Sequence, residues 1–189
     1  MDLGTLWTWL YWSWIALEVV IAVGTRTRRR QGNIQDRGTQ ILLWVVIVLS
    51  LVASGWMRHL HLADMHMKER WLRSASVALL AAGLAVRITA ILTLGKSFSA
   101  NVATRAAQTI QQSGLYSVIR HPSYLGMEII FFAIGLHTRD WACLGAAFVP
   151  PTLAVLYRIH VEEAALLSAF GAEYAKYMRT TKRLIPWVY

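Results

Sequence analysis

The stretch WLRSASVALLAAGLAVRITAILTL, residues 71–94, sets the fold class, because it is long and apolar enough to cross a bilayer as one helix. Its alanines and Gly83 are the small residues that let helices pack closely in lipid. Further apolar runs cover residues 3–24 and 41–57 before it and 124–136 and 141–157 after it. The sequence therefore predicts an all-α integral membrane protein with about five transmembrane helices.

The composition of the chain agrees with a membrane protein. Of its 189 residues, 56% are hydrophobic and 15% are charged, whereas soluble domains carry about 25% charged residues. No separate soluble domain fits beside the predicted helices. The net charge of +9 indicates basic loops that set topology and contact membrane lipids, and no nucleic acid is expected as a partner. The single cysteine, Cys143, excludes an intramolecular disulfide and thiolate metal clusters.

Basic residues predict the orientation of the chain. Arginines cluster at positions 26, 28, 29, 30 and 37, and since cytoplasmic loops are rich in Lys and Arg, this cluster places the N-terminus outside. Five spans then place the C-terminus in the cytoplasm, with the basic segments 95–120 and 158–189. We expect one structural unit: three N-terminal transmembrane helices in residues 1–94, and a loop, a helical hairpin and a C-terminal helix in residues 95–189.

The C-terminal helix is predicted to be amphipathic. Between residues 162 and 178, apolar side chains recur at helical spacing opposite charged ones, so we expect this helix to lie at the membrane surface. Pro186 marks its end, and Trp187 and Tyr189 suit an anchor at the interface. The apolar positions are Leu166, Leu167, Phe170, Tyr174, Tyr177 and Met178.

Three ionisable residues lie inside predicted spans, where a charge is costly and usually has a partner or a function. Glu18 and Arg87 both fall about 10 Å from the cytoplasmic ends of their helices at a rise of about 1.5 Å per residue. They are expected either to pair with each other or to line a substrate pocket. Glu128 follows Tyr124 by one turn on the same helix face, and it is assigned equally to pocket and to packing.

The loop after residue 57 contains His59, His61, Asp64 and His66, whose side chains can bind a divalent metal. The predicted topology puts this loop outside, and no second cluster in the sequence completes a site. An interfacial loop is the favoured interpretation, and no metal is expected in the protein.

The segment 114–126, GLYSVIRHPSYLG, passes from a polar loop into an apolar run. Pro122 suits the first turn of a helix, and the free N–H groups of a helix start attract anionic atoms. His121 and Tyr124 fall on one face of that helix and can reach the same ligand. Arg120 is interpreted as a ligand for phosphates or lipid head groups.

A second polar cluster, Arg158 with Glu162 and Glu163, closes the next span from the same side. The two clusters flank the predicted hairpin. Together they predict a pocket for a polar cofactor at the cytoplasmic membrane edge, with access from lipid.

Five short motifs follow one another in the second half of the chain. They are Gly114-Leu115-Tyr116, Arg120-His121-Pro122-x-Tyr124-x-Gly126, Arg158-x-x-x-Glu162-Glu163, Phe170-Gly171-x-Glu173-Tyr174-x-x-Tyr177 and Ile185-Pro186. In this order they resemble the isoprenylcysteine carboxyl methyltransferase family, in its short prokaryotic form. The resemblance implies an enzyme of a prokaryotic inner or plasma membrane that takes methyl from S-adenosylmethionine on the cytoplasmic side. Ala164 departs from the pattern, because relatives often carry a third acidic residue there.

The resemblance also implies roles for single residues, and it makes residues 95–189 the catalytic part. Arg158 matches an arginine at the acceptor end of the pocket, and Glu162 joins it as a catalytic candidate. Arg87 and Glu128 are candidates for binding the acceptor because of their positions inside predicted spans, not because of the resemblance. The residues implied to bind S-adenosylmethionine are Tyr116, His121, Pro122, Tyr124, Gly126 and Glu163.

The acceptor itself is expected to be a lipophilic small molecule or a lipid-modified peptide. A carboxylate acceptor is already ionised and needs a cation, for which Arg158 is the first choice. An amine acceptor, as in a phospholipid N-methyltransferase, would need a base such as His121. Two further classes stay open: an NADPH-dependent sterol-type reductase, which carries a similar Arg-His-Pro-x-Tyr-x-Gly segment, and a non-enzymatic membrane scaffold.

Overall fold

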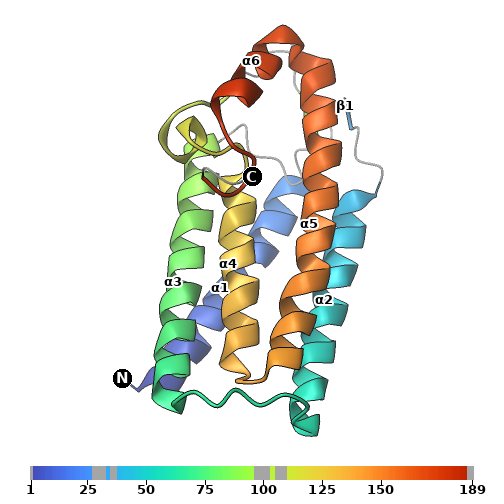
Figure 1. The fold of residues 1–189 in the computed structure, drawn as a ribbon. Helices are drawn as coiled ribbons and strands as arrows, with labels where there is room; N and C mark the ends of the chain where they lie inside the picture. Colours follow the sequence, from blue (N-terminus) through green and yellow to red (C-terminus); the bar gives the residue numbers. More distant parts are fainter. Residues whose placement is uncertain (1, 27–32, 35–37, 96–102, 105–109, 187–189) are drawn as a thin grey trace.

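The computed structural model describes the chain except for residues 1, 27–32, 35–37, 96–102, 105–109 and 187–189. Five long helices form the body of the molecule (Figure 1), and short elements connect them. The elements are α1 (Leu3–Arg26), β1 (Asn33–Ile34), α2 (Thr39–Met57), η2 (Arg58–Leu60), α3 (Glu69–Leu94), β2 (Ala103–Thr104), η4 (Gly114–Ser117), α4 (Pro122–His137), α5 (Trp141–Phe170) and α6 (Ala172–Thr180). The two short strands pair antiparallel.

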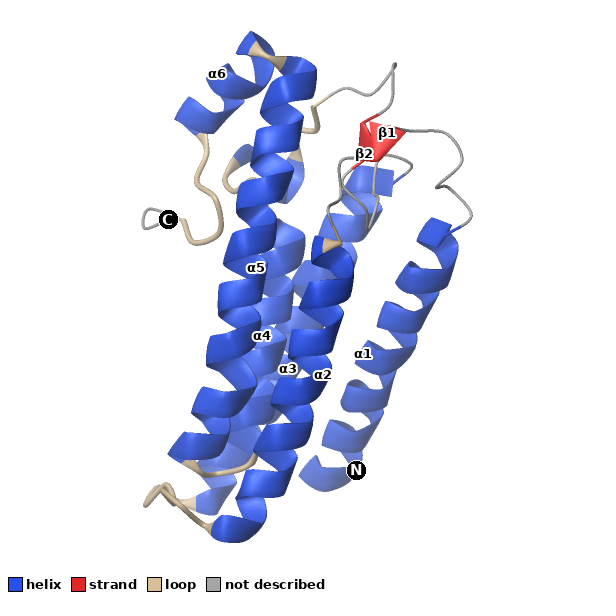
Figure 2. Ribbon diagram, turned by 90° about the vertical axis from the view of Figure 1, so that its right-hand side faces the viewer, coloured by secondary structure: helices blue, strands red, loops and turns tan. Residues whose placement is uncertain are grey.

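The long helices pack in the order α1, α3, α4, α5, α2, so that α4 lies between α3 and α5. Figures 1 and 2 show that the C-terminal ends of α1, α3 and α5 and the N-terminal ends of α2 and α4 share the end that carries α6. The described residues 110–120 and 158–186 therefore lie at one end of the bundle, as the predicted topology requires.

Four helices, α1, α2, α3 and α5, are long and apolar enough to cross a membrane, and α4 is a shorter apolar helix of 16 residues. The predicted all-helical membrane fold is confirmed in this form, while the full count of five spans and the direction of insertion stay predictions. Much of the apolar surface of the long helices is exposed, including Val20, Ile41, Val52 and Leu92. Side chains of this kind suit contact with lipid.

Close packing of α3 on α4 depends on two glycines. A Cβ atom at Gly126 would lie 2.8 Å from the backbone nitrogen of Arg87 and from the carbonyl oxygen of Gly83. A Cβ atom at Gly83 would lie 2.7 Å from the Ile130 side chain. The small residues predicted to allow close helix packing do so here, and Gly126 has this structural role whatever else it does.

The C-terminal half of the chain differs from the prediction. Helix α5 does not end near residue 157 but continues to Phe170, even though it contains Pro150 and Pro151. The chain turns at Gly171, whose φ of 52° is strained for other residues, and α6 follows. The predicted amphipathic helix 162–178 is therefore wrong in its extent, because its first half belongs to α5. Only α6 is amphipathic: it buries Tyr174 and Tyr177 and exposes Glu173, Lys176 and Arg179. Trp187 and Tyr189 lie outside the described residues.

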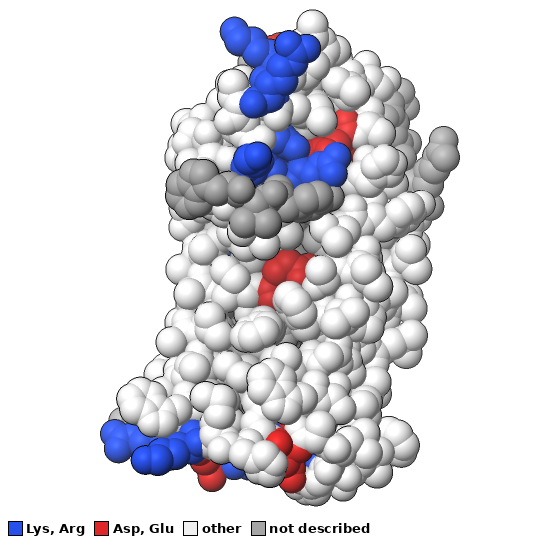
Figure 3. Space-filling model, viewed as in Figure 1, with Lys and Arg blue, Asp and Glu red and all other residues white. Residues whose placement is uncertain are grey.

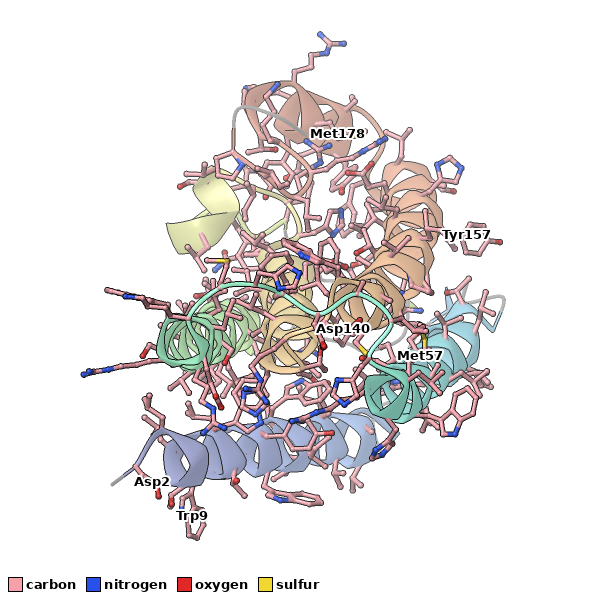
Figure 4. The ribbon with its side chains drawn as sticks, turned by 60° about the horizontal axis from the view of Figure 1, so that its bottom comes forward. Asp2, Trp9, Met57, Asp140, Tyr157 and Met178 are labelled. Carbon is pink, nitrogen blue, oxygen red and sulfur yellow. The ribbon has the colours of Figure 1, made fainter. Side chains whose placement is uncertain are left out.

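The end of the bundle opposite α6 is closed by a corner around Asp140. Its carboxylate accepts hydrogen bonds from the backbone N–H of Cys143, at 2.9 Å, and of Ala63, at 2.8 Å. Figure 4 shows Asp140 between the helices at this end, whereas Trp9 and Tyr157 point outward. In the nearby loop His61 contacts Asp64, and the described part of the chain holds no group of three or more His, Cys, Asp or Glu residues arranged for a metal.

Candidate active site

Polar side chains gather where α4 begins and α5 passes it. Helix α4 starts at Pro122, with His121 as the preceding residue. The segment before it pairs with the C-terminal tail: the Arg120 N–H donates to the Lys182 carbonyl at 2.8 Å, and the His121 N–H donates to the Arg183 carbonyl at 3.0 Å. The tail that follows α6 therefore returns to the motif at residues 120–126 and fixes the start of α4.

Glu163 is the centre of one buried cluster. Its Oε1 accepts from Arg120 Nε at 2.7 Å and lies 3.4 Å from His121 Nε2, and its Oε2 accepts from Arg183 Nε at 2.8 Å. Arg120 also donates to the Thr181 carbonyl. Both carboxylate oxygens are occupied by cations and the imidazole, so Glu163 connects α5 to the start of α4 and to the tail.

A second network lies beside the first along the α4–α5 interface. The Tyr124 hydroxyl donates to Glu162 Oε2 at 2.9 Å and accepts from Arg158 Nε at 2.8 Å. Arg158 Nη1 donates to the Thr39 hydroxyl at the start of α2, also at 2.8 Å. Arg158 is 3% exposed, and its guanidinium is held by these two hydroxyl groups inside the protein. The network joins three helices around one phenol.

Tyrosines from the flanking elements cover both clusters. Tyr177 donates to the Tyr116 carbonyl at 2.6 Å, and Tyr116 donates to the Ala90 carbonyl at 3.3 Å. Tyr174 is buried, and its hydroxyl has no hydrogen-bond partner among the described residues. Burial, reinforced by the nearby carboxylates, raises the pKa of Tyr116 and Tyr174, and burial raises that of Tyr177 to about 12. All three phenols are therefore neutral donors at physiological pH.

The ionisable residues within the bundle fall into two kinds. Glu18 and Arg87 form a buried ion pair, with Arg87 Nη2 donating to Glu18 Oε2 at 2.7 Å. Arg87 Nη1 donates to the backbone and side chain of Ser123. The predicted Glu18–Arg87 pair is confirmed, and Glu18 and Ser123 together engage all three guanidinium nitrogens. Glu128 Oε2 lies 2.5 Å from the Thr152 hydroxyl, but its Oε1 is buried without a partner in the described chain.

Charged side chains on the surface lie mainly toward the two ends of the molecule. Figure 3 shows Lys and Arg toward the two ends and a broad band between them that is uncharged apart from one acidic patch. This distribution fits a bundle that crosses the apolar part of a bilayer and holds its basic groups at the head-group levels. The polar site lies toward the end that carries α6.

The structure brings together most of the residues that the sequence singled out. Two hydrogen-bonded groups lie at one end of α4 and α5: His121 with Glu163, and Tyr124 with Arg158 and Glu162. Tyr116 lies in the same region, Pro122 begins α4, and Gly126 faces α3. Arg87 lies on the other side of α4, in its pair with Glu18.

Sequence reasoning missed some participants. Arg120 was expected to bind phosphates or lipid head groups, but it is buried against Glu163 and Thr181, so that interpretation is wrong. Arg183 and Thr39 were not singled out. The only signal for Arg120 and Arg183 was the excess of nearby cations over the acidic pair, since a buried carboxylate needs basic partners.

These features define a helical membrane protein with a buried polar site at one end of its bundle. Residues 76–168 match the sequence profile of the isoprenylcysteine carboxyl methyltransferase (ICMT) family. The resemblance that the motifs indicate is thus confirmed, and this motif-bearing part of the chain is similar to the ICMT family.

Individual relatives agree with this similarity. A protein-S-isoprenylcysteine O-methyltransferase of Tribolium castaneum is 30% identical over 122 residues, which cover 62% of this chain and 43% of the relative. Methanethiol S-methyltransferase 1 of Bradyrhizobium diazoefficiens is 36% identical over 73 residues, 39% of this chain and 25% of the relative. The solved structure of the eukaryotic intramembrane Ras methyltransferase ICMT superposes with a TM-score of 0.59 at 25% identity, covering 79% of this chain and 51% of that one. The match thus spans less than half the length of these two curated relatives.

Proposed function

We propose that this protein is an integral membrane methyltransferase that uses S-adenosylmethionine and methylates a lipophilic acceptor, with a carboxylate as the first expected methyl acceptor. The observation that carries the proposal is the network of Tyr124, Arg158 and Glu162, whose positions match the family motifs and meet at one end of α4 and α5. Residues 95–189 act as the catalytic part in this proposal, and residues 1–94 complete the membrane bundle.

The residues present fit a polar, cationic cofactor. Tyr174 offers a buried hydroxyl without a partner in the described structure, and Glu162 uses only Oε2 in its bond to Tyr124. His121, Tyr116 and the N-terminus of α4 lie alongside. When bound, S-adenosylmethionine supplies an electrophilic methyl group. Glu162 compensates positive charge there, and Glu163 positions His121 and the C-terminal tail rather than contacting the ligand with a spare oxygen.

The acceptor end of the site is assigned to Arg158. Its guanidinium holds an acceptor carboxylate and orients one oxygen for attack, which needs no general base because a carboxylate is already ionised. Tyr124 keeps Arg158 and Glu162 in fixed relation. The contribution of the protein is then mainly positioning and electrostatics. Arg87 receives no support for an acceptor role from its contacts, because Glu18 and Ser123 occupy its nitrogens.

A thiol is the second candidate acceptor, because one relative is named for methylation of methanethiol. A thiol, like an amine, has to lose its proton during the transfer, and Glu162 and His121 are the groups in reach of such a step. The site is proposed to face the cytoplasm of a prokaryotic inner or plasma membrane, the side on which the basic loops of the chain are predicted.

Cofactor binding provides the first test. Detergent-purified protein is titrated calorimetrically with S-adenosylhomocysteine and, in parallel, with NADPH. We expect binding of S-adenosylhomocysteine alone, loss of affinity by at least about tenfold in His121→Ala, as for removal of a hydrogen bond to a charged group, and no loss in His160→Ala, a control at an exposed histidine of α5. Binding of NADPH alone would favour the reductase class, and binding of neither would favour a scaffold.

Acceptor chemistry provides the second test. Methyl transfer from labelled S-adenosylmethionine is measured with N-acetyl-S-farnesyl-cysteine, with an alkyl thiol and with phosphatidylethanolamine. Arg158→Met is expected to lower turnover of the carboxylate by about a hundredfold, the value of a hydrogen-bonded charge contact, and to change S-adenosylhomocysteine affinity little. Arg158→Lys should recover part of the turnover, because it keeps the charge but not the planar fork. Equal losses of turnover and cofactor affinity would assign Arg158 to the cofactor instead.

A further inference from the structure

Polar side chains continue from the site into the apolar part of the bundle along the α4–α5 interface. Glu128 follows Tyr124 by four residues on α4, which at about 1.5 Å per residue places it about 6 Å further along the helix axis. On α5, Thr152 precedes Arg158 and bonds to Glu128. The acidic side chain of Glu128 is therefore the next polar group after Tyr124 and Arg158 toward the middle of the bundle.

The carboxyl group of Glu128 is incompletely satisfied. The residue is 6% exposed, its Oε2 lies 2.5 Å from the Thr152 hydroxyl, and its Oε1 has no hydrogen-bond partner within the described chain. An unpaired polar atom in an apolar interior costs free energy. The neighbouring α4 residues Met127, Ile130 and Phe131 belong to the apolar core.

The protons available at this position indicate a neutral carboxyl. The Thr152 hydroxyl lies 2.5 Å from Glu128 Oε2 and 2.7 Å from the Phe148 carbonyl, and its single proton can serve only one of them. Both contacts are satisfied when the Glu128 carboxyl donates to Thr152 Oγ1 and Thr152 donates to Phe148. The remaining oxygen, Oε1, is then a carbonyl-type acceptor that needs a donor.

The surface of α5 next to Thr152, the partner of Glu128, is apolar and exposed. Figure 3 shows acidic atoms in the otherwise uncharged band over the region where α4 and α5 meet. The neighbouring α5 residues Val149 and Leu153 are 52% and 63% exposed, as expected for side chains that contact lipid.

We propose that Glu128 selects the acceptor: its free Oε1 accepts a hydrogen bond from an N–H or O–H group that a lipophilic carboxylic acid carries close to its carboxylate. The carboxylate then lies at Arg158, the donor at Glu128 and the apolar chain between α4 and α5 toward lipid. An N-acylated, S-alkylated cysteine has this chemistry, because its amide N–H stands next to its carboxylate. This inference rests on the proposed function for the identity of the carboxylate end.

Two probe acids that differ in one donor test the proposal: N-acetyl-S-farnesyl-cysteine, and S-farnesyl-3-thiopropionic acid, which lacks the amide. Their binding to the detergent-purified full chain is measured by calorimetry. The wild type should bind the amide-bearing probe about threefold to tenfold more tightly, the usual value of one neutral hydrogen bond. Glu128→Gln should keep this preference, because its carbonyl accepts and its NH₂ replaces the donor to Thr152. Glu128→Leu should bind both probes equally.

Folding and cofactor binding are monitored so that the outcomes stay separate. Glu128→Leu removes an unsatisfied polar group and is expected to elute as the wild type does on size exclusion, and Glu173→Gln, at an exposed position of α6, is the control. Equal affinities of the wild type for the two probes, or a preference that persists in Glu128→Leu, would overturn the proposal. If Glu128→Gln loses the preference, the wild-type acceptor is an ionised carboxylate and not a neutral carboxyl. That outcome would also overturn the proposal. Failure of methyl transfer with the preference intact would overturn the proposed function alone.

Discussion

Helix α4 carries polar groups on two sides, and the two sides differ in how completely those groups are paired. Toward α3, Ser123 joins the Glu18–Arg87 pair, in which both carboxylate oxygens and all guanidinium nitrogens have partners. Toward α5, Tyr124 and Glu128 belong to a set that leaves Glu128 Oε1 without a partner among the described residues. A fully paired buried group stabilises the fold, whereas an unpaired one at a comparable depth indicates a ligand.

The largest predicted loss of stability is at Arg87, on the fully paired side of α4. Arg87→Leu leaves Glu18 buried without its cation, which should destabilise the protein by about 3–5 kcal/mol. Unfolding of the purified protein in mixed micelles with increasing denaturing detergent measures this loss. Arg73→Leu, on the same helix but in an exposed pair with Glu69, should cost less than about 1 kcal/mol.

The double variant Glu18→Leu/Arg87→Leu sharpens this test. It removes both charges together, so most of the stability should return, and S-adenosylhomocysteine should bind with the affinity of the wild type. A double variant that folds well but no longer binds the cofactor would mean that the pair is part of the site, and the division between the two sides of α4 would fail.

A smaller, functional effect is predicted on the α5 side. Tyr124→Phe removes the hydroxyl that bridges Arg158 and Glu162, and hydrogen bonds to charged groups are worth about 1.5–3 kcal/mol. Methyl transfer should therefore fall about tenfold to a hundredfold, while the unfolding midpoint changes little because both charged groups keep other contacts or partial exposure. Tyr157→Phe, on the outward face of α5 (Figure 4), is the matched control and should change neither methyl transfer nor the unfolding midpoint. Loss of stability without loss of turnover would make the α5 side structural as well.

Much of this division could be predicted from the sequence. The depth of Glu18 and Arg87 in their spans indicated a pair, because two helices that run the same way bring equal depths together. The position of His121 and Tyr124 at the start of one helix and of Arg158 and Glu162 at the end of the next indicated a shared site, because a short hairpin brings those ends together. Both expectations needed only helix geometry and span order.

The surroundings of Glu163 could not be predicted in the same way. Arg120 and Arg183 reach it through pairing of the chain at residues 118–121 with the tail at 182–183, and contacts between segments so far apart leave no periodic signal. The extent of α5 was hidden for a different reason: apolar periodicity continues across residue 157, and only the positive φ of Gly171 fixes where the helix ends. The unpaired oxygen of Glu128 depends on side-chain packing, which no sequence pattern records.

The smallest effect is predicted at Asp140, at the end of the bundle away from the site. Both oxygens of its carboxylate have hydrogen-bond partners, as in the Glu18–Arg87 pair: one oxygen caps α5 and the other accepts from the Ala63 N–H. Asp140→Ala should cost about 1–2 kcal/mol, as for the loss of a helix cap, and Asp140→Asn about half of that, because the amide oxygen still caps Cys143 but the other bond is lost. Cofactor affinity should be unchanged in both variants.

The dependence of stability on pH checks the same carboxylate. Burial by itself raises the pKa of Asp140, but hydrogen bonds from the backbone N–H groups of Cys143, Ala63 and Ala142 outweigh it, so the pKa lies below its ordinary value. A carboxyl with a lower pKa in the folded state stabilises the fold above its unfolded pKa of about 3.9. That contribution is lost as the pH falls through the folded value. Asp140→Asn should therefore flatten the acid limb of the stability curve below about pH 4. An acid limb identical to that of the wild type would mean that the corner at Asp140 does not depend on the carboxylate.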